Sequence, residues 1–150
     1  MLNPQIYRIT SLAKGEGAPS ANLYLNADAN GNLTVNYDGS LATSQWRLWY
    51  YPGQVTSAPM PGAVILVNVA SGKILTMNAD KTLTMSEPVK IDDYHCWTIA
   101  DPGAIRSAHD GSCNLNVSGS GPYDNGNPVI VYGWDALSDN LNERWNFQEM

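Results

Sequence analysis

The chain has 150 residues, the size of one domain that can bury a hydrophobic core without disulfide support. A formal net charge of −6, with no run of Lys or Arg, argues against nucleic acid and anionic membranes as partners. Only 15% of the residues are charged, 13 glycines and 9 prolines punctuate the chain, and apolar residues do not recur at helical spacing, so a helical bundle is excluded.

Residues 1–17 lack the continuous apolar segment of a secretory signal. We therefore expect a cytoplasmic protein, or one released without a classical signal peptide. The longest strongly apolar stretch, residues 62–69, is too short to cross a bilayer. Cys96 and Cys113 lie outside any C-x-x-C spacing, which favours reduced, buried thiols over a zinc site or a disulfide.

Short runs of apolar and β-branched residues, bounded by turn formers, recur along the whole chain and predict an all-β domain. In chain order they include Ile6-Tyr7-Arg8-Ile9, Asn22-Leu23-Tyr24-Leu25, Leu33-Thr34-Val35, Val64-Ile65-Leu66-Val67, Leu83-Thr84-Met85 and Val129-Ile130-Val131-Tyr132.

Turn signals separate these runs. Asn30-Gly31 predicts a two-residue type I′ hairpin turn, because both residues tolerate positive φ. A calcium loop starting at Asp28 is rejected, since its twelfth position is Gly39 rather than the bidentate Glu. Residues 51–62 contain three prolines and few charges, which indicates an exposed connector between two repeats.

Three tryptophans, Trp46, Trp97 and Trp145, recur roughly every 50 residues, and each closes a similar stretch of four predicted strands. The first two stretches share the sequence Asn-Ala-Asp, at 26–28 and 78–80. Four short strands cannot bury an apolar face alone, so we expect three units to close into one barrel around the tryptophans. This predicts a single domain over residues 1–150 with pseudo-threefold symmetry and repeats at approximately 1–53, 54–101 and 102–150.

The third repeat carries the most specific motifs. They are Gly111-Ser112-Cys113-Asn114-Leu115-Asn116-Val117, Asn125-Gly126-Asn127-Pro128-Val129 and Asn142-Glu143-Arg144-Trp145. In the order and spacing of these motifs, the chain resembles the ricin B-type (R-type) β-trefoil lectins, whose repeats end in Gln-x-Trp. Residues 128–134 are similar to a segment of fungal members of this family. The first two closing motifs, Ser44-Gln45-Trp46 and His95-Cys96-Trp97, are degenerate. The resemblance implies a six-stranded barrel capped by three hairpins, up to one shallow sugar pocket per repeat, and glycan ligands of the galactose or N-acetylgalactosamine type.

A sugar pocket needs an aromatic platform and side chains that donate and accept hydrogen bonds together, as asparagine does. In the third repeat, we expect Tyr132 or Trp134 to stack on the sugar. Asn116 and Asn142 would hold its hydroxyls, with support from Glu143. By resemblance, Asn116 stands where the family usually has Asp, and Glu143 where it has Gln. The alternatives are turn capping for the two asparagines and packing in the barrel or cap for the two aromatics.

The first repeat predicts a weaker pocket from Asn26, Asn36, Tyr37 and Gln45, because Thr43 replaces the asparagine three residues before the tryptophan. In the second repeat, Asn78, Tyr94 and His95 are candidates, but Ser86-Glu87-Pro88 replaces the expected aromatic. We expect that second site to be inactive or to serve another purpose.

A single good site would bind free sugar weakly. Useful avidity would then need a homodimer or densely displayed glycans.

Catalysis is not predicted. His95 and His109 lie near carboxylates in the sequence, yet no motif places Ser or Cys beside them for nucleophilic chemistry, and metal-ligand spacing is absent. We therefore expect a non-enzymatic protein without cofactor or metal. The alternative function is a β-trefoil protease inhibitor acting through an exposed loop. Residues 51–62 are the candidate loop, although a plain linker is the simpler interpretation.

Overall fold

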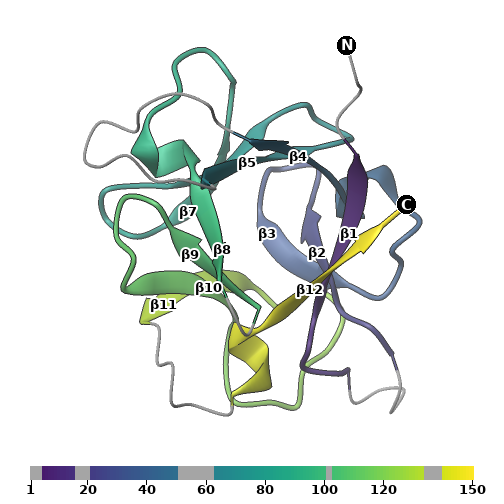
Figure 1. Cartoon of the computed structure of the whole chain (residues 1–150). Helices are drawn as coiled ribbons and strands as arrows, with labels where there is room; N and C mark the ends of the chain where they lie inside the picture. Colours follow the sequence, from purple (N-terminus) through teal and green to yellow (C-terminus); the bar gives the residue numbers. More distant parts are fainter. Residues whose placement is uncertain (1–4, 16–20, 51–62, 101–102, 134–139) are drawn as a thin grey trace.

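The computed structural model describes residues 5–15, 21–50, 63–100, 103–133 and 140–150. These residues form twelve β-strands and three short 3-10 helices, which confirms the predicted all-β class (Figure 1). The strands are β1 (Ile6–Ser11), β2 (Tyr24–Ala27), β3 (Leu33–Asn36), β4 (Gln45–Tyr50), β5 (Ala63–Asn68), β6 (Ile74–Met77), β7 (Leu83–Ser86), β8 (Trp97–Ala100), β9 (Ala104–Ser107), β10 (Cys113–Val117), β11 (Val129–Gly133) and β12 (Trp145–Glu149). The 3-10 helices are η1 (Ala42–Ser44), η2 (Asp93–His95) and η3 (Leu141–Glu143).

Six of the strands form a barrel. β1 pairs with β4 and β12, β5 pairs with β4 and β8, and β8 pairs with β9, all antiparallel. The ring closes where the Trp145 backbone N–H donates to the Gly103 carbonyl at 2.9 Å. Gly103 has a φ of +110°, and a Cβ added there would lie 2.6 Å from the Trp145 carbonyl oxygen. This closing contact therefore requires glycine.

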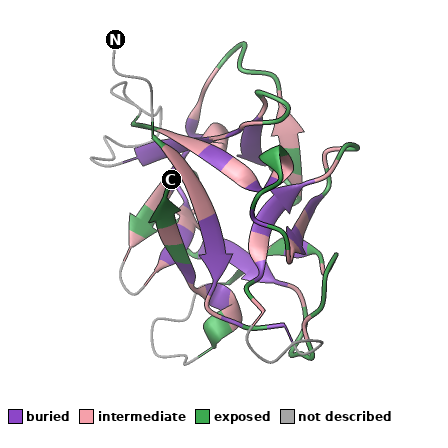
Figure 2. Ribbon diagram, turned by 90° about the vertical axis from the view of Figure 1, so that its right-hand side faces the viewer, coloured by how far each residue is buried: buried purple, intermediate pink, exposed green. Residues whose placement is uncertain are grey.

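Three hairpins, β2–β3, β6–β7 and β10–β11, complete the fold. Each is joined to the barrel through its first strand, by the pairs β1–β2, β5–β6 and β9–β10. The same order of barrel strand, hairpin, 3-10 helix and barrel strand thus occurs three times: the first unit is β1–β4, the second β5–β8 and the third β9–β12. Buried residues gather along these strands, while exposed residues concentrate in the turns and at strand ends (Figure 2).

Trp46, Trp97 and Trp145 belong to the shared hydrophobic core and are at most 3% exposed. Each indole N–H donates to a backbone carbonyl of the hairpin in its own unit. The acceptors are, in order, Leu25 at 2.9 Å, Leu75 at 3.0 Å and Leu115 at 2.9 Å. The repeated tryptophan therefore fills the shared core and also fastens each hairpin to the barrel, which accounts for its recurrence in the sequence.

The loop at Asn30-Gly31 differs from the predicted type I′ turn. Ala27 and Leu33 pair directly, so the hairpin loop spans residues 28–32, and Gly31 alone among the loop residues has a positive φ, +81°. Asp28 Oδ1 accepts from the backbone N–H groups of Asn30 and Asn32, each at 2.9 Å. The bond from Asn32 is the main reason that the pKa of Asp28 lies below its ordinary value. The prediction of turn type was wrong because this carboxylate supplies acceptors that favour the longer loop.

The matching loop of the second unit places Lys81 where the first has Gly31, with a φ of +65°. A side chain in the left-handed region costs about 1 kcal/mol. Lys81→Gly is therefore expected to raise the free energy of unfolding by about 0.5–1 kcal/mol, since the exposed contact of Lys81 with Asp110, at 3.8 Å, contributes little. Urea denaturation measures the change. The reverse exchange, Gly31→Lys, should lower stability by a similar amount, and unchanged midpoints in both variants would contradict the argument.

Within the described residues, no helix is long and apolar enough to span a membrane. Cys96 and Cys113 are both buried and unpaired. The proposed connector, or inhibitory loop, at residues 51–62 lies outside the described residues.

Candidate functional site

The hairpin β10–β11 of the third unit has one apolar and one mixed face. Its core-facing residues are Cys113, Leu115, Val117, Val129 and Val131. On the other face, Asn114 pairs with Tyr132 and Asn116 pairs with Ile130. Directly opposed residues of an antiparallel pair share a face, so these four side chains form one continuous surface.

The 3-10 helix η3 is held beside this surface by side-chain amides. Asn142 Nδ2 donates to the carbonyls of Val117 at 3.0 Å and Gly119 at 3.2 Å. Asn114 Nδ2 donates to the Glu143 carbonyl at 3.3 Å. The short helix therefore keeps a fixed position against the hairpin, and it brings the Glu143 side chain to the side of Asn116.

An open pocket of about 310 Å³ lies between the hairpin and η3. This volume is at the small end of the range for small-molecule sites. The lining residues are Asn116, Val117, Gly119, Ile130, Tyr132, Asn140, Asn142 and Glu143. Four of the five residues predicted from the sequence, namely Asn116, Tyr132, Asn142 and Glu143, thus meet around one cavity, whereas Trp134 lies outside the described residues.

Two of the residues that line the pocket hold buried acceptor oxygens. Asn116 and Glu143 are each 4% exposed, and neither Asn116 Oδ1 nor Glu143 Oε2 has a hydrogen-bond partner among the described residues. A buried polar atom left unpaired costs about 1–3 kcal/mol. A ligand that donates hydrogen bonds at both oxygens would remove this cost.

The rim of the pocket is apolar. Tyr132 is 63% exposed and Ile130 is 37% exposed, and both lie on the mixed face of the hairpin. An exposed ring beside buried acceptors suits a ligand with one C–H face and an edge of hydroxyls.

Asn142 has a structural contact that differs from the local turn capping left as an alternative, because its amide joins η3 to the carbonyls at the end of β10. Its amide nitrogen is committed to two backbone carbonyls, so Oδ1 is the atom through which it could contact a ligand. Glu143, expected only to support its neighbours, instead lines the pocket.

Two lining side chains, Ile130 and Asn140, were not predicted. Ile130 could have been predicted from strand alternation, because alternate residues share a face and Ile130 is two residues before Tyr132. It pairs with Asn116 in the structure. No sequence signal separates Asn140 from the many other loop asparagines.

In the first unit, the corresponding groups are bonded to each other. Asn26, at the position of Asn116, donates through Nδ2 to Thr34 Oγ1 at 3.1 Å and accepts from Ser44 Oγ at 3.0 Å. The other predicted residues are also engaged within the protein: Asn36 accepts from the Asp38 N–H, Tyr37 donates to Asp124, and Gln45 donates to the Ser40 carbonyl. The described contacts therefore leave this unit without the unpaired acceptors of the third.

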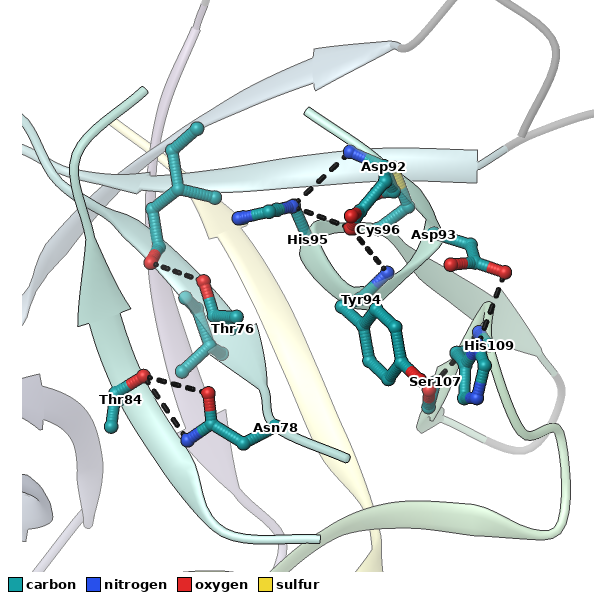
Figure 3. Close-up of polar contacts among 12 residues, drawn as sticks. Thr76, Asn78, Thr84, Asp92, Asp93, Tyr94, His95, Cys96, Ser107 and His109 are labelled. Carbon is teal, nitrogen blue, oxygen red and sulfur yellow. Dashed lines mark hydrogen bonds and ion pairs between the residues drawn. The ribbon is translucent and has the colours of Figure 1, made fainter. Parts of the chain in front are cut away.

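Two histidines pair with carboxylates beside η2, one within the second unit and one that reaches it from the third (Figure 3). His95, at the position of Glu143, has its Nδ1 2.8 Å from Asp92 Oδ1, and His109 Nδ1 lies 3.1 Å from Asp93 Oδ2. Tyr94 stacks on the His109 ring with centroids 3.9 Å apart.

The remaining polar groups of this unit are likewise bonded internally. Asn78 Nδ2 donates to Thr82 and Thr84, and Thr76, at the position of Asn116, donates to the Ile74 carbonyl. Burial, followed by the nearby Asp92 and Asp93 carboxylates, raises the pKa of Cys96 to about 11, so its thiol is not a nucleophile at neutral pH.

Within the described part of the chain, no three His, Cys, Asp or Glu side chains come together as a metal site.

Several known structures match this fold over nearly the whole chain. ThreeFoil, a designed protein with threefold symmetry, matches with a TM-score of 0.74 and 20% identity, over 97% of this chain and 99% of its own. The fold is the β-trefoil. The agglutinin of Rhizoctonia solani matches this β-trefoil with a TM-score of 0.67 and 22% identity, over 100% and 98% of the two chains. The Macrolepiota procera ricin B-like lectin, solved with lactose, matches with a TM-score of 0.66 and 19% identity. The match covers 98% of this chain and 96% of the lectin.

The same β-trefoil also forms part of longer chains. This chain covers 18% of a mosquitocidal holotoxin and 28% of a GH43 β-1,3-galactosidase. No protein-family model and no curated protein matches the sequence.

Proposed function

We propose that this β-trefoil is a lectin, a non-enzymatic protein that binds glycans in the third-unit pocket. The observation that carries the proposal is the pair of buried acceptors, Asn116 Oδ1 and Glu143 Oε2, without described partners beneath an exposed tyrosine. Two acceptors in one pocket suit neighbouring sugar hydroxyls, each of which can donate a hydrogen bond. Tyr132 stacks on the C–H face of the sugar, and Asn142 Oδ1 accepts at the side. Trp134 remains the predicted alternative to Tyr132 as the stacking aromatic.

Galactose-type sugars are the proposed ligands. The resemblance of the third repeat to R-type lectins supports this choice, and so does the lactose bound by the Macrolepiota procera lectin, because lactose ends in galactose. N-acetylgalactosamine belongs to the same class, since it has the same ring stereochemistry.

We propose that the pocket binds sugars and does not hydrolyse them, because of the number of carboxylates that line it. Glycosidases use two carboxyl groups on either side of the scissile bond. Among the described lining residues, Glu143 is the single carboxylate. A pocket of this size also binds one sugar weakly, so we propose that tight attachment to a surface depends on dimerisation or on dense glycans.

A glycan array probed at several protein concentrations tests the proposal. Signals confined to galactose- or N-acetylgalactosamine-terminated glycans are expected, and they should rise steeply where the glycans are densely printed. Absence of any glycan signal, combined with inhibition of a cysteine or serine protease, would replace this proposal with the inhibitor alternative.

A further inference from the structure

The third-unit pocket has a net negative charge, and this has a consequence for the class of sugar that it accepts. We infer that the pocket takes neutral saccharides and excludes those that carry a carboxylate or sulfate close to the bound ring. The inference rests on the proposed function. It adds discrimination between neutral and acidic sugars, which the galactose assignment does not include.

The charge of the pocket comes from Glu143. Of the described lining residues, it is the one charged side chain, and none is Lys, Arg or His. It is 4% exposed, so bulk water screens it poorly. Arg144, the adjacent base in the sequence, does not line the pocket.

The two buried unpaired oxygens favour a ligand that donates, beside the Asn116 amide nitrogen and the Tyr132 hydroxyl, which can themselves donate. The two buried unpaired atoms of the pocket, Asn116 Oδ1 and Glu143 Oε2, are both acceptors. The amide nitrogen of Asn142, which would otherwise be a donor, is committed to two backbone carbonyls. An acidic sugar would therefore meet acceptors and a like charge, whereas hydroxyls can donate to the same atoms.

Three methyl galactosides that differ at carbon 6 alone separate charge from shape. They are methyl galactoside, methyl galacturonide and the methyl ester of methyl galacturonide. Titration calorimetry or NMR titration should show the galacturonide binding at least about tenfold more weakly than the galactoside, because like charges repel strongly in a partly buried site. The neutral ester should recover most of this loss. If the array selects another neutral hexose, its uronic acid and ester replace this series.

The Glu143→Gln variant supplies the matched control, because it keeps the size of the side chain and removes its charge. The readout is the affinity ratio of ester to acid, which should fall to within about threefold of unity.

Several results would overturn the inference. Equal binding of acid and galactoside by the wild type would do so while leaving the lectin proposal intact. An ester as weak as the acid, or a ratio unaffected by Glu143→Gln, would show that shape rather than charge discriminates. Absence of binding to any neutral sugar would overturn the proposed function together with the inference.

Discussion

Asn116→Leu is expected to weaken sugar binding at least about tenfold while leaving the protein at least as stable as the wild type. Asn116 is 4% exposed, and its Oδ1 has no partner among the described residues, so an apolar side chain of similar size removes a desolvation cost rather than a hydrogen bond. The same change deletes one of the two buried acceptors. Affinity on the best array ligand should fall by at least about tenfold, the value of a hydrogen bond lost at a buried partner.

Asn26→Leu is the matched control, because Asn26 holds the same position in the first unit. Its amide bonds to Thr34 and Ser44, and Ser44 is fully buried. The variant should therefore lose about 1–3 kcal/mol of unfolding free energy and bind sugar as the wild type does. Thermal melts and array binding, measured together, give opposite patterns for the two variants. If both lose stability and keep binding, Asn116 is a structural residue and the pocket is assigned wrongly.

Gly103→Ala should be the most damaging single-methyl change in the described barrel. The added Cβ would meet the Trp145 carbonyl oxygen at 2.6 Å, and the residue would also keep a φ of +110°. A loss of about 3 kcal/mol or more of unfolding free energy is expected, because strain and a backbone clash combine at the point where the ring closes. Chemical denaturation measures it.

Two other glycines separate these effects. Gly72 has a φ of +69° but nothing within 4 Å of an added Cβ, so Gly72→Ala should cost about 1 kcal/mol. Gly133 has open space and no positive φ, so Gly133→Ala should change stability by less than about 0.5 kcal/mol. Similar losses in all three variants would show that the contact at Trp145 is not limiting.

Much of the fold could be predicted from the sequence, because its signals are local and repeated. Alternating runs gave strands such as β5 and β11, and the three tryptophans gave the pseudo-threefold barrel. The turn at Asn30-Gly31 was predicted with the wrong type, since the side chain of Asp28 competes for the backbone N–H groups of the loop. The turn propensity of Asn30 and Gly31 alone takes no account of the bonds that the Asp28 side chain makes.

The sequence predicted most of the residues that form the candidate site, but not which contacts each of them makes. Asn116, Asn142 and Glu143 stand out by motif, yet which of their atoms are used within the protein depends on the path of the chain around them. Asn142 reaches the carbonyls of Val117 and Gly119 only because η3 packs against β10. The internal bonding of Asn26 in the first unit similarly depends on Ser44, 18 residues away. Long-range partners of this kind leave no periodic trace in a single sequence.

The bond from each central indole fastens the hairpin of its own unit from within, in addition to the bonds that join neighbouring units. The polar groups beside the hairpins differ from unit to unit: bonded amide and hydroxyl groups in the first, the His95–Asp92 pair in the second, and buried oxygens without described partners in the third. For protein engineering, this recommends confining a library to the outward face of one hairpin and its short helix, while the remaining two thirds of the chain serve as an unaltered frame.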